Sequence, residues 1–169
     1  VQHPNYLMIP QSITSMGYAA FGGSLAVGAA QVPDGWDSGW HNGNDSELIW
    51  NVASIYFDDV YGVTYALHND KTATVLAFTD EVEHVELIVP AGYTVTYIGD
   101  YAFYECYNLQ SITIPEGVTT IGSHAFYNCY NAMLTDLPST LTTIGSYAFC
   151  GVQHPNYLMI PQSITSMGY

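Results

Sequence analysis

Residues 109–129 read LQSITIPEGVTTIGSHAFYNC, and the pattern in this stretch decides the fold because it recurs along the chain. Its most regular part, I-G-x-x-A-F, occurs at 98–103, 121–126 and 144–149, so successive copies begin at a constant spacing. Self-similarity at a fixed period of roughly 20–50 residues is typical of stacked repeat proteins. One unit of this length cannot bury its own apolar face, so we expect successive units to share one continuous interior.

Each unit predicts a strand, a proline turn, a second short extended piece, a glycine corner and an Ala-Phe pair. The glycine after isoleucine predicts either a positive φ or a close approach of two backbones. We expect the phenylalanine to fill the centre of each unit, so that these rings lie in one file. The predicted strands alternate apolar and polar residues and span 85–90, 110–115, 132–138 and 156–161. We also expect these rings to take part in the assembly of coil on coil. The phenylalanines of the pattern are Phe21, Phe103, Phe126 and Phe149.

The run 109–129 closely resembles the BspA-like leucine-rich repeats, the LRR_5 type, of bacterial and protist surface proteins. Their consensus runs roughly L-x-x-I-x-I-P-x-x-V-x-x-I-G-x-x-A-F-x-x-C, and the resemblance covers residues 85–169 and 1–23. It implies a mainly β, right-handed leucine-rich-repeat solenoid with coils of about 23 residues. It also implies a secreted or cell-wall protein associated with adhesion. Residues 132–151 depart from the pattern, because Cys150 follows Phe149 directly.

A second, longer repeat is superimposed on the first. Residues 1–18 reappear letter for letter as residues 152–169, which gives a period of 151 residues. We therefore expect the chain to be an excerpt or processed product of a longer protein with tandem modules.

Residues 24–60 break the short repeat with a tryptophan-rich insert. It resembles the ending that follows the last repeat in many family members, which implies that Trp36, Trp40 and Trp50 cap an open solenoid end. A carbohydrate-stacking platform is the alternative for these tryptophans. Calcium is a further alternative for the insert, although its Asp34, Asp37 and Asp45 do not match an EF-hand loop.

The next segment, 61–78, predicts a hairpin, because two alternating runs flank the polar turn His68-Asn69-Asp70-Lys71. In the family a similar hairpin starts the repeat domain. The predicted organisation is therefore terminal coils at 1–30, a tryptophan-rich cap or linker at 31–60, a capping hairpin of the next module at 61–84, and solenoid coils at 85–169.

The composition excludes several classes of partner. One basic residue, Lys71, stands against 15 carboxylates, for a formal net charge of −14. Such a chain cannot neutralise phosphates, which argues against nucleic acid and anionic lipid. It also has no apolar run long enough to cross a membrane. We expect an extracellular or cell-surface location.

Three cysteines, Cys106, Cys129 and Cys150, follow the short repeat and predict a column of small buried residues. A disulfide between neighbouring coils, or a metal site, remains the alternative. No resident cofactor or metal is predicted, because no ligand spacing matches a known site.

The first function hypothesis is an extracellular structural or adhesive protein that forms a stalk or head-to-tail filament by stacking coil on coil. Its main partner is then another copy of the repeat. The alternative function is an adhesin module that recognises a host protein or a glycan through surface tyrosines. For the tyrosines themselves, the other interpretation is that they pack one coil on the next. The candidates are Tyr101, Tyr104, Tyr107, Tyr127, Tyr130 and Tyr147. His124 alternates with tyrosine in this pattern, which favours a surface role over a ligand role. No set of nucleophile, base and orienting residue is present, so we expect no enzyme activity.

Overall fold

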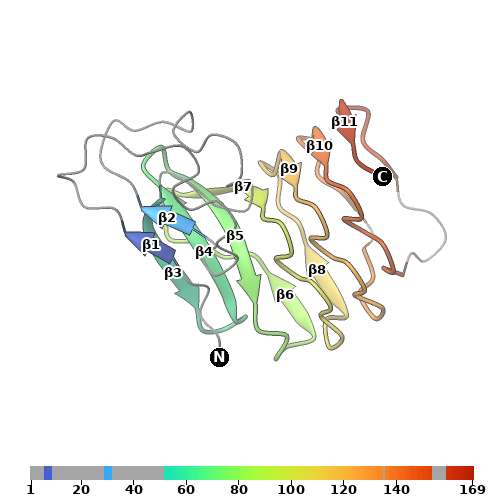
Figure 1. Cartoon of the computed structure of the whole chain (residues 1–169), viewed down its shortest axis with the longest axis horizontal. Coiled ribbons are helices and arrows are strands. Elements are labelled where there is room, and N and C mark those ends of the chain that lie inside the picture. Colours follow the sequence, from blue (N-terminus) through green and yellow to red (C-terminus); the bar gives the residue numbers. More distant parts are fainter. Residues whose placement is uncertain (1–5, 9–28, 32–51, 135, 154–158) are drawn as a thin grey trace.

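The computed structural model describes residues 6–8, 29–31, 52–134, 136–153 and 159–169. Within these residues every regular element is a β-strand, and none of them forms a helix long and apolar enough to cross a membrane. The coils that contain β7 to β11 stack along the long axis of the molecule (Figure 1). The prediction of a mainly β solenoid is confirmed.

A parallel sheet runs along one side of the stack. It consists of β7 (Thr94–Ile98), β9 (Thr120–Ile121), β10 (Thr143–Ile144) and β11 (Ser166–Met167). The register pairs Tyr97 with Thr120, Thr120 with Thr143, and Thr143 with Ser166, so the offset between coils is constant. This offset confirms the predicted coil length of about 23 residues.

Threonine side chains add a second set of contacts at the same offset. The Oγ1 of Thr119 donates to the carbonyl oxygen of Thr96 at 3.2 Å, and the Oγ1 of Thr142 donates to that of Thr119 at 3.0 Å. Each contact joins one coil to the next, so these hydroxyl groups help to hold the coils in register.

The other side of the stack is less regular, and here the predicted strands were too long. Only β6 (His84–Glu86) and β8 (Ser111–Thr113) form a ladder, and single bridges continue it through Met133 to Gln153. The spacing between partners in the sequence shrinks at each step, so no long ladder stays in register. Residues 159–161 form no strand, and the rest of the predicted strand 156–161 lies outside the described residues.

The predicted hairpin is present, and the sheet it belongs to is larger than expected. Strand β4 (Val63–His68) pairs antiparallel with β5 (Thr72–Phe78), and Lys71 in the turn has a φ of 68°. A third strand, β3 (Val52–Asp58), pairs antiparallel with β4, although sequence analysis placed this segment in the cap.

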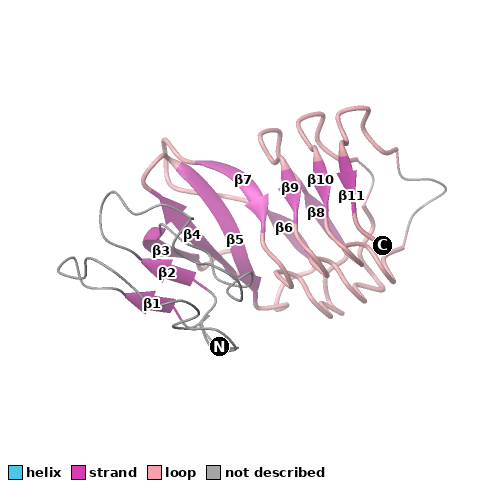
Figure 2. Cartoon of the chain, turned by 45° about the horizontal axis from the view of Figure 1, so that its top comes forward, coloured by secondary structure: helices cyan, strands magenta, loops and turns pink. Residues whose placement is uncertain are grey.

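This antiparallel sheet is continuous with the coils, because β5 pairs in parallel with β7 (Figure 2). Phe78 at the end of β5 lies against Phe103, with ring centroids 5.3 Å apart. The hairpin therefore packs against the first coil, and its role as a cap stays a prediction.

Two short strands show the same spacing nearer the start of the chain. Strand β1 (Tyr6–Met8) pairs in parallel with β2 (Ala29–Gln31), and the register joins Tyr6 to Ala29 at the same offset as between the solenoid coils. Strand β2 crosses the boundary predicted between residues 30 and 31. The sequence contains a sign of the pairing between β1 and β2, because Pro33 follows Pro10 at the same spacing as Ala29 follows Tyr6.

Candidate functional site

A column of phenylalanine rings forms the axis of the interior. The Phe103 and Phe126 rings are stacked with centroids 4.9 Å apart, and the Phe126 and Phe149 rings are 5.7 Å apart, both pairs at an interplanar angle of 9°. Phe103 and Phe126 are fully buried, whereas Phe149 at the open end is half-buried. The predicted single file of rings is observed, and the part of these residues in assembly stays a prediction.

The glycine that precedes each turn is required by the close approach of two coils. A Cβ atom on Gly122 would lie 2.6 Å from the backbone nitrogen of Asp100, and one on Gly145 would lie 2.6 Å from the carbonyl carbon of Gly122. Neither glycine has a positive φ. Of the two predicted reasons for this glycine, close backbone approach is therefore the correct one.

The positive φ angles occur elsewhere in the turn, at two positions per coil. The second position holds Glu105, Asn128 and Gly151 in successive coils, and asparagine and glycine are residues that tolerate this conformation. The first position holds Tyr101, His124 and Tyr147, with φ between 55° and 59°. A left-handed residue with a Cβ costs about 1–2 kcal/mol. The chain thus keeps an aromatic ring in three successive coils at a place where backbone geometry disfavours it.

These rings belong to a set of seven aromatic side chains on the surface, which we call the aromatic ladder. The ladder has three columns that cross from coil to coil: Tyr101–His124–Tyr147, Tyr104–Tyr127 and Tyr107–Tyr130. Neighbouring rings within a column have centroids 4.9–6.0 Å apart and interplanar angles of 4–28°. Five of the tyrosines are 41–51% exposed, and Tyr127 and His124 are half-buried. The structure thus brings together all six tyrosines singled out from the sequence, together with His124.

The stacking direction determines what the ladder presents to the outside. Within each column the rings stack on one another, but the first and second columns are inclined to each other, by 59° between Tyr101 and Tyr104 and by 52° between His124 and Tyr127. Tyr104 and Tyr107 lie beside the Glu105 carboxylate, and partial burial, followed by this negative charge, raises the pKa of both hydroxyl groups. The phenols therefore stay protonated and neutral at physiological pH.

Two polar groups complete the surroundings of the ladder. Asn128 donates from Nδ2 to Glu105 Oε1 at 3.5 Å, across neighbouring coils. The Nδ1 atom of His124 is buried and has no hydrogen-bond partner.

The chain's single lysine, Lys71, holds its Nζ 4.7 Å from the centroid of the Tyr93 ring, which is not part of the ladder.

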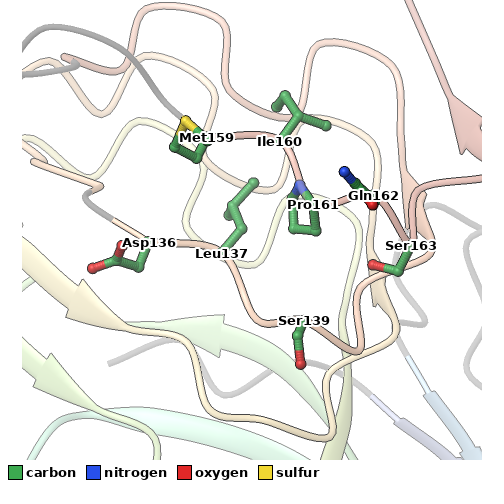
Figure 3. Close-up of a pocket in the computed structure, with 8 residues that line it drawn as sticks. All are labelled: Asp136, Leu137, Ser139, Met159, Ile160, Pro161, Gln162 and Ser163. Atoms are coloured by element: carbon green, nitrogen blue, oxygen red, sulfur yellow. The ribbon is translucent and has the colours of Figure 1, made fainter.

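A second surface feature lies at the open end of the stack, where a groove with a volume of about 400 Å³ separates two coils (Figure 3). Leu137 lies among Met159, Ile160 and Pro161, whereas Asp136 points away from them. Met159 and Ile160 are 67% and 44% exposed. The last described coil therefore leaves apolar side chains uncovered.

The cysteines only partly follow the prediction. Cys106 and Cys129 are buried in neighbouring coils, and the Cys129 thiol donates to the carbonyl oxygen of Phe103 at 2.8 Å. Contact with Cys129, followed by burial, raises the pKa of Cys106, which keeps that thiol protonated. Cys150 is exposed, so the prediction of a buried column is wrong there. The reason is its position directly after Phe149, which places it outside the turn position that the other two occupy. All three are free thiols.

Other predicted sites lie outside the described residues, namely Phe21, the three tryptophans Trp36, Trp40 and Trp50, and the aspartates of the alternative calcium loop. In the part of the chain that is described, no group of three or more His, Cys, Asp or Glu side chains is placed to hold a metal ion. The expectations of no cofactor and no enzyme activity stay predictions.

Comparison with known proteins agrees with the geometry. Residues 76–169 match the BspA type leucine rich repeat region in six copies. A leucine rich cell surface protein from Faecalibacterium prausnitzii A2-165 is 32% identical, with a TM-score of 0.52 over 68% of this chain and 32% of that protein. A leucine-rich repeat protein from Bacteroides capillosus ATCC 29799 is 25% identical, with a TM-score of 0.56 over 65% of this chain and 86% of that one.

The leucine rich repeat protein of T. pallidum shares the fold at 22% identity, with a TM-score of 0.54 over 67% of this chain and 64% of that protein. No curated protein matches the chain. The chain spans about a third of the F. prausnitzii protein. The family match covers more than half of the 169 residues and coincides with the coils that stack at a constant offset. The chain belongs to the BspA type leucine-rich repeat family.

Proposed function

We propose that this chain is part of an extended extracellular structural or adhesive protein, in which the open coil of one copy stacks on the first coils of the next. The supporting observation is that successive coils pair at a constant offset, so that one coil presents to the next a surface on which a further coil can stack. Strand β11 is the outermost strand of its sheet, and Met167 within it is 58% exposed. An unpaired strand edge with apolar neighbours is a template for pairing with another chain.

The duplicated sequence supports the same proposal from the other end. Strand β1 lies in the first copy of this sequence, residues 1–18. It pairs in parallel with β2 at the same offset that separates the solenoid coils. The second copy, residues 152–169, has the identical sequence and therefore the same capacity to accept a coil at that offset. Contact between two different surfaces of identical chains produces an open filament when the rotation between copies does not close a ring, and straight end-to-end stacking of coils favours the filament.

The family relationship fits an adhesive role at the cell surface. The similar F. prausnitzii protein is described as a cell surface protein. Solenoids also present extended surfaces for binding. The exposed aromatic ladder, held at strained backbone positions, favours a second candidate function, an adhesin module that recognises a ligand.

Electron microscopy and sedimentation velocity over a range of protein concentrations test the assembly. We expect elongated particles whose length grows with concentration. Met167→Lys places a charge on the open edge and should abolish this growth. Gln110→Lys adds the same charge at an exposed residue directly before β8; it is the matched control and should leave this growth intact. Short, monodisperse particles at every concentration would remove the assembly proposal.

A further inference from the structure

We propose that the aromatic ladder, together with Glu105, is a docking surface for a basic protein segment rich in arginine or lysine. The proposal names the partner class for the second candidate function and rests on that function. It does not depend on stacking of copies end to end, because the ladder lies along the side of the coils.

The geometry of the turn does not explain why it holds the rings of the ladder's first column. The same coils contain two left-handed positions. The one outside the ladder's first column holds Glu105, Asn128 and Gly151, and two of these three are residues that backbone sterics favour there. The other left-handed position, in the ladder's first column, holds Tyr101, His124 and Tyr147. Each stacked pair contributes about 0.5–1.5 kcal/mol, which offsets only part of the backbone cost. Strained residues of this kind cluster at functional sites.

The second step is what the ladder offers to a partner. Because stacking within each column covers the facing sides of neighbouring rings, a neutral sugar finds fewer open ring faces on which to stack. The groups on the side of the molecule are phenol oxygens and the half-buried Glu105 carboxylate. Since the phenols are protonated, their oxygens accept hydrogen bonds from N–H donors while Glu105 supplies the negative charge.

The third step is the charge of the whole chain. With a net charge of −14 and one lysine in 169 residues, the chain attracts cations and repels anionic glycans and nucleic acids. The lysine is already placed over Tyr93, so it does not neutralise Glu105. A guanidinium or ammonium group therefore meets an acceptor-rich surface with no competing cation among the described residues. Charge complementarity of this kind increases the association rate and selects the partner.

Fluorescence anisotropy with a labelled deca-arginine peptide tests the proposal, with deca-glutamate and a neutral oligosaccharide as comparison probes. We expect binding of deca-arginine alone. The double variant Tyr104→Phe/Tyr127→Phe keeps the stacked rings and removes two hydroxyl groups, so the fold is retained while affinity falls at least about tenfold. Glu105→Gln should weaken binding by a similar factor.

The matched control is Glu86→Gln, which makes the same change in charge at an exposed residue of β6, away from the ladder. It should change affinity less than about twofold, as expected for a distant charge in physiological salt. Equal weakening by Glu86→Gln and Glu105→Gln, with no effect of the tyrosine variant, would reduce the binding to non-specific attraction and overturn the proposal. Preferred binding of the oligosaccharide would overturn it as well. Neither result depends on assembly, which Met167→Lys reports separately.

Discussion

The substitution Phe126→Ala should destabilise the solenoid more than the same change in any ring at its end. Phe126 is fully buried, and its ring lies between Phe103 at 4.9 Å and Phe149 at 5.7 Å. Removal of the ring therefore creates a cavity between two coils and breaks two stacked pairs. Buried Phe→Ala changes cost about 3–5 kcal/mol, and we expect a value in that range.

The matched comparison is Phe149→Ala. Phe149 stacks on a single ring within the described column, and it is half-buried at the open end. Its truncation removes less apolar burial and one aromatic pair, so we expect about 1–2 kcal/mol.

Urea unfolding followed by circular dichroism measures both values, with linear extrapolation to water. Phe126→Leu is a useful third variant, because it keeps most of the apolar volume and should fall between wild type and alanine. A cost below about 1 kcal/mol for Phe126→Ala, or a cost no larger than that of Phe149→Ala, would refute the argument that a shared column of rings supports the stack.

Three further predictions follow from other contacts. Gly122→Ala should destabilise by about 1–3 kcal/mol, because the added Cβ would lie 2.6 Å from the Asp100 nitrogen; an unchanged or higher melting temperature would contradict this. His124→Tyr should be neutral or stabilising in thermal unfolding, because it continues the stack between Tyr101 and Tyr147 and removes a buried nitrogen without a partner; a lower Tm than wild type would count against it. The N–H and hydroxyl groups of Ser139 lower the pKa of Glu116 below its ordinary value of 4.5. A carboxyl group whose pKa is lowered by folding stabilises the folded state at pH values above its unfolded pKa. This contribution to the free energy of unfolding is lost as the pH falls from about 4.5 through the lower pKa of the folded state. Glu116→Gln should therefore flatten stability against pH in that acidic range, and an unchanged pH profile would show that the contact is not made in solution.

The repeat unit was the part of the fold that sequence alone predicted best. A fixed spacing, with glycine and phenylalanine at constant positions, leaves stacking as the way to bury each apolar face. The observed register at Tyr97, Thr120, Thr143 and Ser166 follows from it directly. The hairpin could be predicted equally well, because two runs of alternating apolar and polar residues flank a polar turn.

The strand assignment within the unit was harder to predict. Alternation favoured the segments before the prolines, yet the regular sheet forms from the short runs directly before each glycine. Pairing depends on a constant offset between coils, and residues 85–153 lose that offset on the proline side. The alternating pattern of one unit predicts which side chains face the core, but the register with the next unit also depends on the length of the connection, which changes from step to step on this side.

The ladder was predicted as a set of tyrosines and not as an arrangement. Sequence spacing indicated that Tyr104 and Tyr127 recur, but the direction in which their ring faces point depends on the turn conformation. That turn contains left-handed residues with bulky side chains, which sequence preferences alone disfavour. His124 was set aside as a polar surface residue, although its alternation with tyrosine is the signal that it belongs to a stacked column.

Successive repeat coils stack in register around one file of phenylalanine rings. Nuclear Overhauser contacts between selectively labelled phenylalanine rings test it in solution. We expect contacts from Phe126 to both Phe103 and Phe149, and none between Phe103 and Phe149. A direct contact between Phe103 and Phe149, or no contact from Phe126 to either ring, would contradict it.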